Sequence, residues 1–227
     1  MFDLKSEVVT DRYYKENSVI PYDENGFCEL KGHRNFAEDE IPPHCLQGGP
    51  NGNLKSRSPI SRVLNAFLNS GHGGTIFVGI LNSKEVKGIV LNLFQQVHVL
   101  VALEDLMKRF SPPVLAHQCS VKFVPVVPED ASGSDVLRIM KSQPSISPGQ
   151  ISHGFPQQKH VLRTDDLCWC DVLNRQANNR KILKYVIEIY VAEWDSSDPR
   201  NVQGVGEMRA RPMYEDEKNR VYFRRAA

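Results

Sequence analysis

Two carboxylates and a lysine lie close together near the start of the chain. Glu24 and Glu29 are separated by four residues, and Lys31 follows two positions after Glu29. Neighbouring carboxylates repel each other unless a positive charge lies between them, and a divalent cation is their usual oxygen-bound partner. Such a cation can activate water, and Lys31, on the same side of a strand as Glu29, can stabilise phosphate charge. The pattern indicates a metal-assisted phosphodiester site, with an edge strand bearing ordinary surface charge as the alternative.

The bulk composition is that of a soluble globular protein. The 227 residues suffice for one large domain or two small ones. The net charge of +1 does not by itself indicate a nucleic-acid binder, although a local basic groove can still bind phosphates. No apolar run reaches the roughly 20 residues of a membrane span, and no signal-peptide core is present. We therefore expect no membrane segment and a cytoplasmic, reducing location.

Five cysteines without a secretory signal favour free thiols or metal ligation over a disulfide framework. Cys28 and Cys45 have no partner at ligand spacing. For Cys119, Cys168 and Cys170, the alternative to metal ligation is that they are buried free cysteines. The chain has no Walker-type phosphate loop or helix-turn-helix pattern, so we expect no ATPase portion.

The elements that must position these residues follow from hydrophobic periodicity and turn signals. Residues 1–18 are predicted to form an N-terminal arm or short helix, and residues 19–227 a single α+β domain. A hairpin is predicted over 19–31, and a helix from Pro59, capped by Ser58 and ended by Gly71. The remaining predictions are strands over 75–80, 86–90, 119–127, 185–194 and 221–223, a helix over 91–109, and flexible insertions at 32–55 and 129–160, the latter with a short strand over 136–140.

An ordered set of motifs resembles the Schlafen family and its Schlafen/AlbA_2-type domain. The motifs are Glu24, Glu29-Leu30-Lys31, Asn65-Ala66-Phe67 with Asn69, Gly73-Gly74, the strand to Gly79, Val86-Lys87-Gly88-Ile89, and the terminal Arg220 to Arg224. They span about residues 22 to 225. The resemblance implies a single lobe with a mixed or antiparallel sheet, flanking helices and a zinc-stabilised region. His72, in the glycine-rich turn, is either a phosphate contact or general acid, or an exposed loop histidine.

The resemblance implies a metal-dependent endoribonuclease that cleaves tRNA or small-RNA precursors, of which piRNA precursors are one kind. Glu24 and Glu29 match the two family glutamates that use Mg²⁺ or Mn²⁺, and Lys31 matches the lysine that follows them. The family aspartate falls at Leu81 or Asn82 here. Leucine cannot bind a cation, and an amide oxygen is a weaker ligand than a carboxylate.

This departure leaves three interpretations open. The chain is a nuclease using two glutamates, one part of a composite site in a homo- or hetero-oligomer with another Schlafen-like chain, or an inactive RNA-binding subunit that pairs with an active partner. Single-stranded DNA also stays open as a substrate, because metal-activated hydrolysis needs no 2′-hydroxyl. RNA would be bound mainly through phosphates. The basic candidates for this are Lys55, Arg57, Arg62, Arg175, Arg180, Lys181 and Lys184.

The resemblance also implies a structural zinc site. His117-Gln118-Cys119 and Cys168-Trp169-Cys170 resemble the family's His-x-Cys pair and its later cysteine pair, with Trp169 inserted between the later two cysteines. One imidazole and three thiolates make a closed tetrahedral set, which is structural rather than catalytic.

Overall fold

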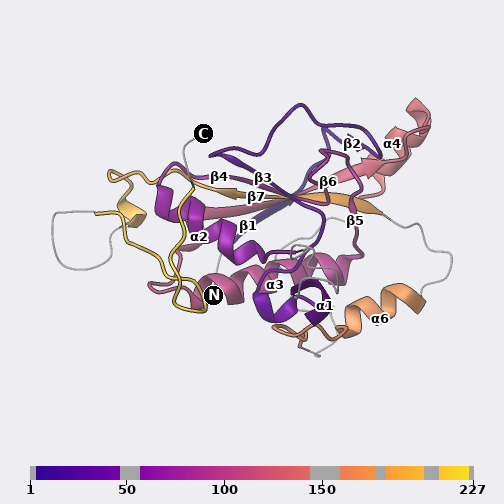
Figure 1. The fold of residues 1–227 in the computed structure, drawn as a ribbon. Helices are drawn as coiled ribbons and strands as arrows, with labels where there is room; N and C mark the ends of the chain where they lie inside the picture. Colours follow the sequence, from indigo (N-terminus) through magenta and orange to yellow (C-terminus); the bar gives the residue numbers. More distant parts are fainter. Residues whose placement is uncertain (1–3, 47–56, 144–158, 177–182, 202–209, 225–227) are drawn as a thin grey trace.

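A computed structural model describes residues 4–46, 57–143, 159–176, 183–201 and 210–224 of the chain. These residues form a mixed α+β fold in which helices pack on one mixed sheet (Figure 1). The predicted fold class is therefore confirmed at this level. No helix in the described ranges is both long and apolar enough to cross a membrane.

The sheet has seven strands among the described residues. They are β1 (Lys5–Val8), β2 (Tyr14–Lys15), β3 (Cys28–Lys31), β4 (Gly74–Val78), β5 (Ile89–Val90), β6 (Cys119–Val127) and β7 (Lys184–Val191). The main order is β1-β6-β7-β4-β3, with β2 paired to β6 and β5 to β7. β7 is antiparallel to β6, β4 and β5, whereas β1 and β2 run parallel to β6, and β3 runs parallel to β4. β3 is thus an edge strand.

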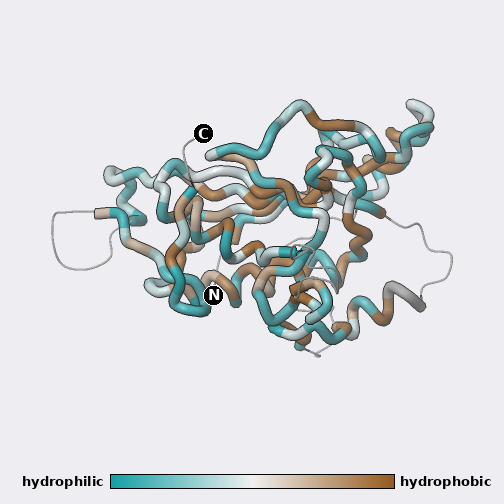
Figure 2. The backbone as a smooth tube through the Cα atoms, in the orientation of Figure 1, coloured by the Kyte–Doolittle hydropathy of each residue, from teal (hydrophilic) through white to brown (hydrophobic). Residues whose placement is uncertain are grey.

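The helices are α1 (Pro43–Leu46), α2 (Ile60–Ser70), α3 (Leu93–Arg109), α4 (Gly133–Lys141) and α6 (Trp169–Gln176). Three short 3₁₀ helices are η1 (Glu38–Glu40), η2 (Ala116–Gln118) and η3 (Pro199–Asn201). Figure 1 shows α2, α3 and α6 on the same side of the sheet. The main core lies between the sheet and these helices, and Figure 2 shows apolar residues concentrated there.

The period-two alternation of the central strands produces two separate core clusters. Ile187 and Ile189 of β7 pack with Phe67 of α2 and Leu103 of α3 in the larger cluster. Val186, one position earlier, belongs to a smaller cluster on the opposite face. Both faces of the central strands are therefore buried.

The ends of α2 follow the sequence signals in part. Gly71 adopts a left-handed φ of 79°, and its N–H bonds to the carbonyl oxygens of Phe67 and Leu68, as predicted. The predicted N-cap is wrong, because Pro59 occupies that position and no side chain caps the helix. The Ser58 hydroxyl instead accepts a hydrogen bond from Lys31.

Several predicted elements are wrong. Residues 19–31 do not form a hairpin, since β3 pairs with β4 and Val19 makes only an isolated bridge to Glu85. Residues 136–140 lie in helix α4, because Ser132 and Asp135 form a capping box at its start. Residues 221–223 are not a strand, since the Tyr222 N–H donates to the Asn65 side chain rather than to a neighbouring strand.

Other boundaries also differ from the predictions. The N-terminal arm contributes strands β1 and β2, and the strand expected over 86–90 shortens to β5. Residues 32–46, expected to be a flexible insertion, bury Phe36, Ile41 and Cys45. Residues 47–55 of the first predicted insertion and 144–158 of the second lie outside the described residues. Residues 129–143 and 159–160 of the second insertion are described, and the former contain α4.

Candidate functional site

Edge strand β3 presents two charged side chains to the helix-covered face of the sheet. Glu29 and Lys31 align in register with Ile76 and Val78 of β4, which belong to the main core. Leu30, between them, belongs to the smaller core on the opposite face. The side chains of Glu29 and Lys31 are only 13% and 10% exposed. This largely buried position requires each charge to have a partner.

Glu29 finds two cationic partners. Its Oε1 lies 2.7 Å from Lys31 Nζ, and its Oε2 lies 2.5 Å from Arg224 Nη1. Lys31 also donates to Ser58 Oγ at 3.0 Å, and Arg224 donates to the Cys28 carbonyl oxygen at 3.0 Å. A divalent cation at Glu29 must therefore displace or join two positive side chains.

Glu24 lies at the open edge of the same strand. Its side chain is exposed, and its Oε1 accepts a hydrogen bond from the Leu30 N–H at 3.1 Å. Burial raises the pKa of Cys28, and the negative charges of Glu24 and Glu29 raise it further. Glu29 and Lys31 are therefore in direct contact, whereas Glu24 reaches β3 through the backbone of Leu30.

Leu81 stands where a third ligand is expected. Gly32 directly follows β3, and a Cβ atom on Gly32 would lie 2.9 Å from Leu81 Cδ2. Leu81 is thus next to the end of the strand that carries Glu29 and Lys31, whereas Asn82 is exposed. Within the described ranges, the acidic pair acquires no third histidine, cysteine or carboxylate in ligand geometry.

The end of β3 is positively charged. Burial, together with the positive charges of Lys31 and Arg57, lowers the pKa of His33 to about 4. Arg57, one of the predicted RNA-binding residues, lies near His33 beyond the end of β3 and donates to Asn35 Oδ1 at 3.4 Å. His72 is exposed and packs edge-on against Phe27, with ring centroids 6.1 Å apart.

The other two basic candidates with described side chains have partners of their own. Arg62 lies over the Tyr222 ring, 5.0 Å from its centroid. Lys184 forms an ion pair with Glu16. Arg175 lies in α6, where its side chain is not described, and Lys55, Arg180 and Lys181 lie outside the described residues.

A second cluster contains only nitrogen and sulfur donors. His98 of α3, His160, Cys168 and Cys170 of α6 place one ligand atom each within 4.8 Å of one another. Cys168 Sγ lies 3.5 Å from His160 Nδ1, and Cys170 Sγ lies 3.4 Å from His98 Nδ1. This His/Cys cluster could hold a metal ion.

The His/Cys cluster differs from the predicted zinc set in two of its four members. His117 Nε2 is hydrogen-bonded to Asn201 Oδ1 at 2.6 Å instead. Cys119 is the first residue of β6 and is 2% exposed in the main core, where burial raises its pKa to about 12. The structure thus keeps Cys168 and Cys170 together but replaces His117 and Cys119 by His98 and His160. The short spacing from His160 to Cys168 is the sequence signal that could have indicated this.

Burial sets the protonation state of the clustered groups. It lowers the pKa of His98 to about 4 and also lowers the pKa of His160, so both imidazoles are neutral at pH 7. It raises the pKa of the Cys170 thiol. Neutral imidazole is the form in which histidine binds metals.

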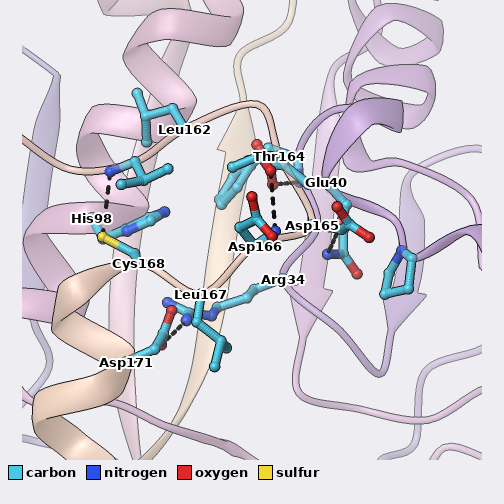
Figure 3. A pocket seen from close by; sticks show the side chains of 14 residues that line it. Arg34, Glu40, His98, Leu162, Thr164, Asp165, Asp166, Leu167, Cys168 and Asp171 are labelled. Atoms are coloured by element: carbon cyan, nitrogen blue, oxygen red, sulfur yellow. Dashed lines mark hydrogen bonds and ion pairs between the residues drawn. The ribbon is translucent and has the colours of Figure 1, made fainter.

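A pocket of about 170 Å³ adjoins the His/Cys cluster. Figure 3 shows His98 and Cys168 on one side of it and the ion pair of Arg34 with Asp171 below them. Gln95 of α3 also donates to Asp171, at 2.6 Å. Neither the family models nor the curated proteins compared with this chain match it.

Proposed function

We propose that this chain is a Schlafen-like metal-dependent endoribonuclease, or a subunit of a multi-chain RNA-processing endonuclease, acting on tRNA or small-RNA precursors. The observation that supports it is the grouping of Glu24, Glu29 and Lys31 around edge strand β3. Leu81 beside Gly32 lies where the resemblance expects the third ligand. The sequence resemblance and this geometry point to the same chemistry.

In this proposal Glu24 and Glu29 hold Mg²⁺ or Mn²⁺, which would supply Lewis-acid activation of water and phosphate. Lys31, held 2.7 Å from Glu29, donates an N–H hydrogen bond to a phosphate oxygen as negative charge develops. Arg57 adds a phosphate contact at the same end of the strand. Arg224 must release Glu29 when the cation binds. The proposal assigns a separate, structural Zn²⁺ to the pair of Cys168 and Cys170.

A second candidate function is an RNA-binding subunit without catalysis of its own. Two observations favour it. Leu81 offers no ligand atom, and Lys31 and Arg224 already compensate Glu29. In that case a second Schlafen-like chain supplies the missing ligand or the whole active site.

Cleavage of end-labelled tRNA and small-RNA precursors by the full chain with Mn²⁺ tests the first proposal. We expect site-specific cuts that Glu29→Gln reduces at least about 100-fold, because a catalytic cation needs its carboxylate ligand. Glu193→Gln, at an exposed position outside the proposed site, is the matched control and should cleave like the wild type.

The outcome separates the two functions. Cleavage that survives Glu29→Gln contradicts the assignment of the site. RNA binding without cleavage, with a steep loss of affinity as salt rises, supports the subunit function instead. Cleavage that appears only after a second Schlafen-like chain is added supports a composite site.

A further inference from the structure

We propose that His98, His160, Cys168 and Cys170 form a closed tetrahedral Zn²⁺ site that ties α6 to α3. This inference does not depend on the nuclease proposal, because the His/Cys cluster shares no residue with the acidic pair. It also differs from the site that the sequence resemblance implies, since His98 and His160 take the places of His117 and Cys119.

The distances fit a zinc tetrahedron. With Zn–S bonds of about 2.3 Å and Zn–N bonds of about 2.0–2.1 Å, the nitrogen and sulfur atoms of a tetrahedral site lie about 3.5 Å apart. The two nitrogen–sulfur contacts here are 3.5 Å and 3.4 Å. A thiol–imidazole hydrogen bond explains either contact alone. It does not explain why two such pairs converge until all four atoms lie within 4.8 Å.

The donor set also selects zinc. Two imidazoles and two thiols are the ligands of structural zinc sites, and hard cations such as Mg²⁺ prefer oxygen. Two thiolates balance the charge of one Zn²⁺. With four protein ligands present, the metal keeps no open position for water, so the site is structural rather than catalytic.

Neighbouring groups hold the ligands in place. Trp169, between the two cysteines, stacks on the His160 ring with centroids 4.9 Å apart and an interplanar angle of 15°. Phe94 of α3 in turn packs edge-on against the Trp169 ring, with centroids 5.4 Å apart. The Val161 N–H donates to Cys168 Sγ at 3.4 Å, as backbone amides often do to metal-bound sulfur. The Cys-Trp-Cys spacing therefore positions a histidine as well as two sulfurs.

The site organises the pocket next to it. Cys168 and His98 line that pocket, and Asp171, one residue after Cys170, pairs with Arg34 there. Cys168 directly precedes α6, and its carbonyl oxygen accepts from the Asp171 N–H at 2.9 Å. Metal binding at Cys168 and Cys170 thus sets where α6 starts and where Asp171 lies.

Zinc analysis and X-ray absorption at the zinc edge of the wild-type full chain test the proposal directly. We expect one zinc per chain, bound by two sulfur and two nitrogen atoms. A shell of three sulfurs and one nitrogen overturns the proposal, because it requires a third cysteine as a ligand. Purified protein that binds no zinc when Zn²⁺ is supplied also overturns it.

Paired variants give a second test. Cys170→Ser and His98→Asn should weaken Zn²⁺ binding at least about 100-fold in competition with a chromophoric chelator. His117→Asn and Cys119→Ala, which remove the two members specific to the set that the resemblance implies, should keep one zinc per chain. The proposal is contradicted if His117→Asn and Cys119→Ala lose zinc while Cys170→Ser and His98→Asn retain it. If Cys170→Ser does not fold, the absorption spectrum of the wild type still decides.

Discussion

Glu29 is neutralised by side chains of its own chain. Lys31 and Arg224 occupy both of its carboxylate oxygens, and its side chain is 13% exposed. Breaking a largely buried ion pair costs free energy unless another cation replaces the lost partner. A divalent ion can do so, and we therefore expect cation binding at Glu29 to release Arg224.

Leu81 is the residue that most limits this site. In the proposed site, an aspartate at position 81, next to Gly32, would add a carboxylate at the end of β3. Leu81→Asp should raise Mn²⁺ affinity at least about tenfold, because each added carboxylate strengthens an oxygen-ligated site. It should also raise the rate of RNA cleavage.

Isothermal titration with Mn²⁺ measures the effect of this substitution, and Leu81→Asn is the neutral control. Equal Mn²⁺ affinity in Leu81→Asp and Leu81→Asn would show that position 81 does not face the cation.

The residue-level prediction succeeded where partners are close in the sequence. Glu29 and Lys31 contact each other because residues two apart share a face of a strand. Arg224 was not assigned to this site, since its contact with Glu29 spans 195 positions and depends on how the C-terminal segment docks. The sequence likewise does not assign His98 to the His/Cys cluster, because its contact with Cys170 spans 72 positions.

At the scale of elements, α2 holds the C-terminal segment 210–224 through two buried asparagines. Asn69 Nδ2 donates to the Tyr214 carbonyl oxygen at 2.8 Å, and Asn69 Oδ1 accepts from the Tyr214 N–H at 2.7 Å. Asn65 Oδ1 accepts from the Tyr222 N–H at 2.8 Å. Asn65 and Asn69 of the sequence motif therefore anchor the C-terminal segment to α2. This anchoring places Arg224 beside Glu29.

Asn69→Leu should destabilise the fold by about 2–4 kcal/mol, because it removes the acceptor of the buried Tyr214 N–H and one of the two donors to the Tyr214 C=O, the other being Asn65 Nδ2. Urea unfolding followed by circular dichroism measures the loss. Asn82→Leu, at an exposed position, should change the free energy of unfolding by less than about 0.5 kcal/mol. Similar losses in both variants would show that the Asn69 bonds are unimportant.

Element predictions failed where local pattern and long-range pairing disagree. The Asn25-Gly26 corner suggested a hairpin, yet β3 finds its partner in β4, beyond helix α2. The apolar residues of 136–140 suggested a strand, but the Ser132 capping box starts a helix there. By contrast, α3 and β6 follow predicted ranges closely, since each has a long periodic pattern and clear end signals.

For the molecule as a whole, buried ionisable groups make stability depend on pH. Burial raises the pKa of Glu40 to about 7, above its ordinary value of 4.5. Between these values the folded chain holds a proton that the unfolded chain has lost, so the contribution of Glu40 to stability falls as pH rises from about 4.5 to 7.

Glu40→Gln removes this dependence. Relative to the wild type, we expect the variant to become more stable as pH rises, by up to about 3 kcal/mol at pH 7. Urea unfolding at intervals from pH 4.5 to 8 gives the difference. Asp39→Asn, at an exposed position on the same turn, controls for removal of a negative charge, together with its exposed ion pair to Lys218. A difference that stays constant with pH would contradict a buried, proton-binding Glu40.

The two candidate metal sites have different chemistry and different places in the fold. Oxygen ligands gather at edge strand β3, and nitrogen and sulfur ligands gather between α3 and α6. Hard and soft cations should therefore bind separately, with Zn²⁺ at the His/Cys cluster and Mn²⁺ at the acidic pair.

Electron paramagnetic resonance of Mn²⁺, titrated into zinc-loaded full-length chain, tests most directly whether Glu24 and Glu29 bind a cation. The free Mn²⁺ signal should fall as the wild type and Glu193→Gln each take up one ion. Glu29→Gln should bind it at least about tenfold more weakly, a loss of about 1.4 kcal/mol. Equal Mn²⁺ uptake by Glu29→Gln and the wild type, or no uptake by either, would contradict the proposed catalytic site.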